Sequence, residues 1–233
     1  MAVLFGCSKL CVPRCAFRFL TIARLVLMAY ATLFKSSASL KEKMNKILLL
    51  ICGVLLSWNA NALEVVGVKL PDTAQVGKVN LQLNGAGLRS KLFIIKIHVY
   101  VGALYLPQKQ TSAEAVIADE REHRMALHIL HELSSKKLLG AFNEAIEANH
   151  TPAELRALDE QLKLMAQIFD VVREVGTGDI ITLDYLPASG TQISVNGKAY
   201  GTIAGVAFNR ALLKIWLGDK PVQEDLKKAL LGG

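Results

Sequence analysis

The stretch NGAGLRSKLFIIKIHVYVGALYLP, residues 84–107, decides the fold of this chain. From Phe93 to Val101 every odd-numbered position is apolar. The even-numbered positions between them are mixed, namely Ile94, Lys96, His98 and Tyr100. A period of two residues is typical of a strand that presents one face to a core. We therefore expect a long strand here.

A pair of glycines precedes this strand, with one alanine between them. Glycine tolerates backbone conformations and close approaches that other residues do not, so Gly85 and Gly87 predict a bend or a bulge. Arg89 follows two positions later. The sequence therefore predicts a tight bend that delivers a single arginine onto a long strand.

Short strands and helices alternate through the rest of the chain. Patterns of period two predict strands at residues 63–70, 75–83, 123–131, 179–185, 191–195 and 198–202. Apolar residues that recur three and four positions apart predict helices at 112–118, from Ser134 or Ser135 to 146, from Thr151 to about 172, at 206–217 and at 222–231. Thr151, Pro152 and Glu154 are typical of a capping box, and Asn196-Gly197 favours a type I′ hairpin turn. Hairpins joined to clustered helices predict an α+β fold, a mainly antiparallel sheet with a helical layer.

Three short motifs of the sequence are informative through their order and spacing. They are Gly85-Ala86-Gly87-Leu88-Arg89, VYVGALYL at 99–106, and FNRALLKIWLG at 208–218 followed by Asp219-Lys220-Pro221-Val222. Together they resemble the chalcone isomerase family, and more closely its bacterial chalcone-isomerase-like branch. The resemblance covers residues 63–232. It implies an open-faced β-sandwich, in which the ligand cleft lies between the sheet and the helices.

Arg89 is the main candidate for a functional residue. A guanidinium stays charged and holds a carboxylate or phenolate through two hydrogen bonds, although an arginine paired with a surface acid is an equal alternative. The resemblance favours a functional role for Arg89, because the family's catalytic arginine occupies the corresponding position of the Gly-Ala-Gly-x-Arg motif. Fatty-acid-binding members use an arginine and a tyrosine on a carboxylate, which here are Arg89 and Tyr100. Eleven positions apart, the two would point to opposite faces of an uninterrupted strand, so we expect a bulge or bend between them.

The other catalytic positions of the family do not match. Where family enzymes carry a threonine on the next strand, this chain offers Tyr100. A tyrosine and an asparagine of the family correspond to Leu138 and Ala145, and a threonine or serine corresponds to Ile215 or Trp216. The resemblance therefore implies that the hydroxyls and waters that would stabilise an oxyanion are missing, while an arginine able to anchor an acid remains.

Charge and hydropathy set the N-terminal part of the chain apart. The chain has a formal net charge of +7, and residues 1–62 carry all of it. Residues 63–233 contain equal numbers of basic and acidic residues. Residues 44–62 show a basic start, an apolar core and Ala60-Asn61-Ala62, which predict a secretory signal peptide cleaved near Ala62. An uncleaved anchor is the alternative. We interpret residues 1–43 as an over-extended N-terminus or a targeting segment, with Met44 as the expected initiator, and 63–233 as the mature domain.

The neutral mature part excludes several classes of protein. Its charge gives no support to nucleic-acid binding, and we expect no integral membrane span there. All four cysteines precede Leu63, which leaves no disulfide or thiolate site, and we expect neither a metal nor a cofactor. No nucleotide-binding, zinc-protease or nucleophile-elbow motif occurs. We expect each of the five histidines to be structural or solvated, and His123 to lie in an exposed loop.

Three functions remain open on these grounds. The first is a secreted or periplasmic, non-catalytic binder of a small apolar acid such as a fatty acid, with Arg89 and Tyr100 as ligand-binding residues. The second is an isomerase, an intramolecular lyase of chalcone isomerase type that uses Arg89 as its catalytic residue. The third is a structural or interaction protein with a vestigial cleft.

Overall fold

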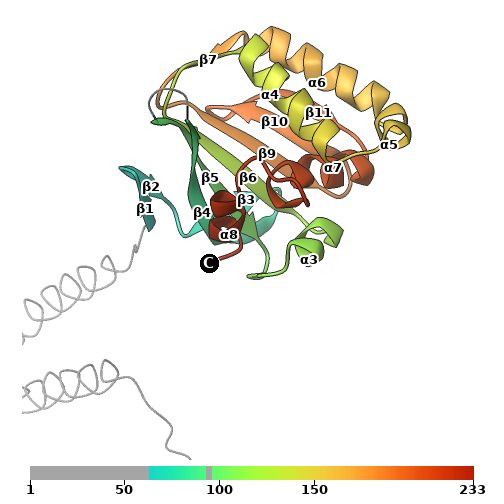
Figure 1. Ribbon diagram of the computed structural model, residues 1–233. Coiled ribbons are helices and arrows are strands. Elements are labelled where there is room, and N and C mark those ends of the chain that lie inside the picture. The colour runs from blue at the N-terminus through green and yellow to red at the C-terminus, as the bar shows by residue number, and fades with distance from the viewer. Residues whose placement is uncertain (1–62, 93–95) are drawn as a thin grey trace, which may run out of the picture. The chain divides into compact units, whose positions relative to one another are not determined.

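One antiparallel sheet organises the fold. The computed structural model describes residues 63–92 and 96–233, and within them seven strands pair in the order β11-β10-β9-β6-β5-β4-β3 (Figure 1). The strands are Thr73–Val76 (β3), Val79–Leu92 (β4), Lys96–Leu106 (β5), His123–Ile129 (β6), Ile180–Leu186 (β9), Gly190–Val195 (β10) and Lys198–Ile203 (β11). The segments 1–43 and 44–62, and the expected strand start at Phe93, lie outside the described residues.

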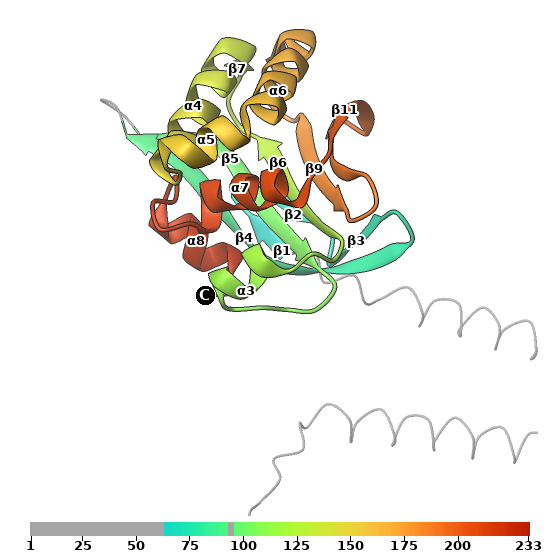
Figure 2. The same ribbon diagram turned by 90° about the vertical axis from the view of Figure 1, so that its right-hand side faces the viewer.

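Helices cover one face of this sheet. They are Ala113–Ala118 (α3), Ser135–Ala148 (α4), Pro152–Ala157 (α5), Asp159–Val172 (α6), Val206–Leu217 (α7) and Glu224–Leu230 (α8). Figure 2 shows α4, α6 and α7 on the same side of the strands. Their apolar faces and the inward side chains of the sheet form the larger core, which includes Leu104, Leu183, Ile193, Phe208 and Leu212. The predicted α+β architecture, an antiparallel sheet under a helical layer, is confirmed.

The opposite face of the sheet has a smaller core of its own. It is formed by Leu70, Val76, Leu81, Leu83, Val101, Ala103, Tyr105 and Ala126. The edge strand β3 also contacts β6 and β9, which are not its pairing partners in the sheet. The sheet therefore curls, and β5 is buried on both faces from Val101 to Leu106.

Three of the expected boundaries were wrong. The strand expected at 63–70 is a hairpin of Leu63–Val65 (β1) and Val68–Leu70 (β2), which turns at Val66-Gly67, where φ is 49° and 78°. A second turn, at Gly77 with φ 57°, separates β3 from β4 within the strand expected at 75–83. The turns contain Val-Gly and Gly-Lys, which are not the usual hairpin dipeptides. Since the apolar alternation continues across both turns, the sequence did not predict either of them. The helix that begins after Thr151 is interrupted at Leu158, although its capping box is present.

Of the bend or bulge expected at Gly85 and Gly87, the structure shows a bulge and no tight bend. Strand β4 continues through both glycines, and its register with β5 shifts between Leu83 and Gly85. A Cβ atom on Gly85 would lie 2.1 Å from the Ala229 carbonyl oxygen, and one on Gly87 would lie 2.7 Å from the Ala229 Cβ. The glycines therefore serve the close approach of α8 to β4, which brings this helix next to Arg89.

Candidate functional site

Arg89 and Tyr100 lie opposite each other on neighbouring strands. Arg89 is in β4, Tyr100 is in β5, and the two are directly paired in the antiparallel register. Directly opposed residues of an antiparallel pair project from the same face of the sheet. The single long strand expected to carry both residues was wrong, because they lie on two antiparallel strands, whereas the interruption expected between them is present. The register also shifts between Arg89 and Ser90, so that Val99 is an extra residue in β5.

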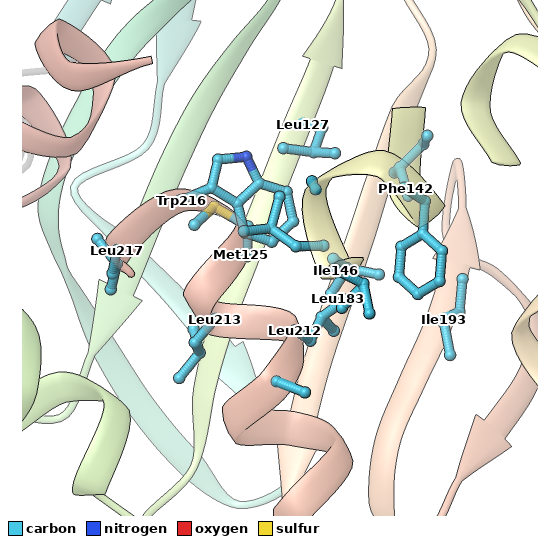
Figure 3. Close-up of a cluster of buried hydrophobic side chains, with 14 of the residues drawn as sticks. Met125, Leu127, Phe142, Ile146, Leu183, Ile193, Leu212, Leu213, Trp216 and Leu217 are labelled. Atoms are coloured by element: carbon cyan, nitrogen blue, oxygen red, sulfur yellow. The ribbon is translucent and has the colours of Figure 1, made fainter. Parts of the chain in front are cut away.

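Both side chains line a cavity between the sheet and the helices. Its volume is about 740 Å³, within the range of small-molecule sites. The sheet contributes residues from β4, β5, β6, β9 and β10, and the helical layer contributes residues from α4, α6 and α7. Most of the lining is apolar, and its members include Leu127, Phe142, Met165, Ile168, Phe169, Ile181, Leu183, Ile193, Val195 and Leu212. Figure 3 shows several of these side chains in the larger core.

The Tyr100 hydroxyl is held by an indole. Trp216 in α7 donates a hydrogen bond from Nε1 to the Tyr100 hydroxyl oxygen at 2.9 Å. Burial raises the pKa of Tyr100, and the Trp216 hydrogen bond and the charge of Arg89 only partly oppose this effect. The phenol therefore stays protonated at neutral pH. Since no described residue accepts its O–H, the hydroxyl can donate to a ligand.

The Arg89 guanidinium is positioned by the start of α8. Its Nη1 donates to the Ser90 carbonyl at 3.0 Å and to Oε1 of Gln223 at 3.3 Å. Gln223 is the N-cap residue of α8 and also accepts from the Ser90 amide and donates to the Leu88 carbonyl. Among residues 63–92 and 96–233, no carboxylate forms a salt bridge with Arg89. The alternative of an arginine paired with a surface acid is therefore wrong for the described chain.

The lining of the cavity also includes charged side chains. Lys91 follows Arg89 on the same face of β4, Lys220 comes from the loop between α7 and α8, and Lys137 comes from α4. Glu144 is the only carboxylate of the described lining. The excess of positive charge in the lining favours an anionic ligand group.

The positions that match the family's other catalytic residues also lie in this cavity. Leu138, Ala145, Ile215 and Trp216 all line it. Only Trp216 offers a polar hydrogen, and that hydrogen is already donated to Tyr100. At these positions the cavity therefore presents no free hydroxyl or amide to a reacting group.

Sequence reasoning missed three parts of this arrangement. Gln223, which orients Arg89, lies 134 positions away from it, and no local pattern predicts such a contact. The lysines of the lining were also missed, since Lys91, Lys137 and Lys220 come from separate segments. Trp216 was matched, as an alternative to Ile215, to a catalytic position of the family, but its hydrogen bond to Tyr100 was not predicted. The only indication in the sequence was that Tyr100 and Trp216 both lie in motifs that resemble the family.

The expectation of an exposed His123 was wrong. The residue begins β6 on the same face as Met125 and Leu127, and only 3% of it is exposed. Its ring stacks on Tyr185, and Nε2 lies 3.0 Å from Oδ1 of Asn209. Its charged neighbours in the sequence suggested a loop, whereas the alternation of β6 directs its side chain inwards. His123 does not line the cavity.

The described residues hold neither a metal-binding cluster nor a helix suited to a membrane. Within 63–92 and 96–233, no group of three or more histidine, cysteine, aspartate or glutamate side chains is arranged to hold a metal ion. In the same residues, no helix combines the length and the apolar character that crossing a membrane requires.

Comparisons with known proteins place this arrangement in a family. A solved structure with a similar fold is that of the fatty-acid binding protein AtFAP1 of Arabidopsis thaliana, with a TM-score of 0.59 and 17% sequence identity over 73% of this chain and 96% of that one. No curated protein sequence matches the chain. The family model described as chalcone isomerase-like matches residues 62–232. The chain therefore belongs to the chalcone isomerase-like family.

Proposed function

We propose that this protein binds a small apolar carboxylic acid, such as a fatty acid, without catalysing a reaction. The carboxylate would lie between Arg89 and Tyr100, and the apolar chain would fill the cavity below α4 and α6. The observation that carries the proposal is the in-register pair of Arg89 and Tyr100 in the lining of a mostly apolar cavity, with no described carboxylate paired to Arg89.

The chemistry of this pair suits a carboxylate. Arg89 uses one nitrogen for Ser90 and Gln223, and its remaining N–H groups are free to donate. Tyr100 accepts from Trp216 and keeps its own proton for donation. Moving an anion out of water is costly unless charged hydrogen bonds replace its hydration. An arginine and a protonated phenol side by side supply that replacement.

The two alternatives have less support. For an isomerase, Arg89 would act without the hydroxyls that the family places around an oxyanion, because Leu138, Ala145 and Ile215 occupy those positions. A vestigial cleft would not account for a cavity of about 740 Å³ that keeps Arg89 and Tyr100 in its lining. The similarity in fold to a protein described as fatty-acid binding adds to the case for binding.

The test compares a long-chain fatty acid with its methyl ester. We expect wild type to bind the acid more tightly. A charged hydrogen bond contributes about 1.5–3 kcal/mol, so Arg89→Ala should weaken acid binding by about ten- to a hundredfold and leave ester binding nearly unchanged. Tyr100→Phe should cost less for the acid, about 0.5–1.5 kcal/mol. Arg156→Ala, at an exposed position of α5 outside the cavity, is the matched control.

Two measurements separate the alternatives. Because Arg89 and Tyr100 would share one carboxylate, the double variant should depart from additivity. Wild type that binds acid and ester equally tightly would refute the carboxylate anchor. Cyclisation of an added chalcone, lost in Arg89→Ala, would favour the isomerase instead.

We further propose that the protein acts outside the cytoplasm, in the periplasm or after secretion. The basic start, apolar core and small-residue site within residues 44–62 support this proposal. Cleavage near Ala62 would release the family domain with no cysteine left in it.

A further inference from the structure

The cavity runs across the strands of the sheet. Its lining includes Arg89 in β4, Tyr100 in β5, Leu127 in β6, Leu183 in β9 and Ile193 in β10. These five strands are consecutive neighbours in the sheet. Neighbouring strands lie about 4.8 Å apart, so the four steps from β4 to β10 span about 19 Å. The long dimension of the cavity is therefore set by the number of strands it crosses.

The polarity of the lining changes along this dimension. Every lining residue from β6, β9, β10 and α6 is apolar, whereas the charged ones come from β4, α4 and the loops. Figure 3 shows Trp216 and Ile193 on opposite sides of the buried cluster, with Leu127 and Leu183 between them. An acid whose head group lies at Arg89 and Tyr100 therefore extends its tail over apolar residues towards β10.

Helix α6 covers the β10 end of the cavity. Met165 and Ile168 of α6 lie over this end and are 3% and 9% exposed. A Cβ atom on Gly201 of β11 would lie only 2.7 Å from the Ile168 Cδ1, so α6 rests directly on the strand beyond β10. Together with Ile193 and Val195, these side chains form an end wall.

We infer that the cavity measures the length of its ligand. An extended chain advances about 3.3–3.6 Å per three bonds, or about 1.2 Å per bond, so 19 Å holds about sixteen bonds. At about 30 Å³ per water-sized group, the volume of about 740 Å³ admits some two dozen non-hydrogen atoms, so length is the limiting dimension. Straight-chain acids of about 14–18 carbons bind best, with the head at Arg89 and Tyr100 and the tail against the end wall. This inference rests on the proposed function, because an anchored head gives the tail a fixed starting point.

The test uses a series of straight-chain acids from eight to twenty-two carbons, which displace a fluorescent long-chain acid. Each added methylene should raise the affinity about fourfold while the tail still enters the cavity. The increase should stop near sixteen carbons, where the tail reaches Ile193.

Two variants move the end wall in opposite directions. Ile193→Trp directs its added ring into the cavity and should shift the optimum by two to four carbons towards shorter acids, since one strand spacing equals about four bonds. Ile168→Ala removes part of the wall and should shift the optimum towards longer acids. Leu164→Trp is the control, because Leu164 is also in α6 but is 45% exposed and outside the lining. It should leave the optimum unchanged.

The outcomes distinguish this inference from the proposed function. An unchanged optimum in folded Ile193→Trp would overturn the measuring role. If that variant does not fold, an unchanged optimum in Ile168→Ala has the same meaning. Affinity that keeps rising to twenty-two carbons, with acid still preferred over ester, would refute the end wall and leave the carboxylate site intact. Equal binding of acid and ester would refute the anchor, and the ester series would then test the wall alone.

Discussion

Replacing Gly85 by alanine should destabilise the protein through a single methyl group. The new Cβ would lie 2.1 Å from the Ala229 carbonyl oxygen and 2.8 Å from that of Leu230. Contacts of this kind below 3.0 Å do not occur, so α8 has to move away by about 0.9 Å. The obstacle is backbone, which cannot rotate aside as the end of a side chain can.

The size of the loss has two bounds. Overpacking of a well-packed interface costs about 1–3 kcal/mol. Complete detachment of α8 would expose Leu226 and Leu230, which are 1% and 0% exposed, at about 1.5–3 kcal/mol each. We therefore expect the free energy of unfolding to fall by about 2–3 kcal/mol, and by no more than about 6 kcal/mol. Because α8 also carries Gln223, binding of an acid should weaken in the same variant.

Urea unfolding followed by circular dichroism measures the loss. Gly140→Ala is the matched control, since a Cβ at this helical position would meet nothing within 4 Å. It should stabilise the protein by about 0.5–1 kcal/mol, because alanine favours a helix over glycine. If Gly85→Ala proved as stable as wild type, the close approach of α8 to β4 would not limit this position, and the explanation of both glycines would fail.

Two further predictions concern pH and localisation. Burial lowers the pKa of His123 below its usual value of about 6.5, so the unfolded chain takes up the proton first and stability should fall as pH drops below about 6.5. His123→Gln should flatten the decline, measured as urea midpoints at several pH values between 7.5 and 5, although His128, whose pKa burial also lowers, keeps part of it. An equal decline in His123→Gln would contradict this. N-terminal sequencing of protein from a periplasmic extract should begin at Leu63; recovery of the 63–233 product in carbonate-washed membranes would argue against secretion.

Local patterns were sufficient to predict most of the elements. The helix at Val206–Leu217 could be predicted from the spacing of its apolar residues alone, because the residues that it buries in the core recur three and four positions apart. The hairpin at Asn196-Gly197 follows from backbone preference, since both residues adopt positive φ, 51° and 79°. The N-cap at Thr151 follows from a side chain three residues away. In each case the deciding interaction lies within a few residues of the chain.

The site depended on contacts that no local pattern contains. Arg89 was identified as a candidate from its sequence motif. Its partner Gln223 could not be identified without knowing that α8 packs on β4. The pairing of Arg89 with Tyr100 needed the register of two strands, and a slip of one residue would place them on opposite faces. His123 was judged by its charged neighbours, whereas its burial depends on α7, which lies more than eighty positions away.

Gln223 has a consequence beyond the orientation of Arg89. Strand β3 pairs with β4 only from Val79 to Gln82, so in the described chain the outer edge of β4 near Ser90 has no neighbouring strand. The amide of Gln223 accepts from the Ser90 N–H and donates to the Leu88 carbonyl, as an adjacent strand would. Unpaired edges recruit strands of other molecules and promote aggregation. The side chain of Gln223 thus occupies the free edge of β4, so that the strand of Arg89 can lie at the border of the sheet without offering this edge to a second copy.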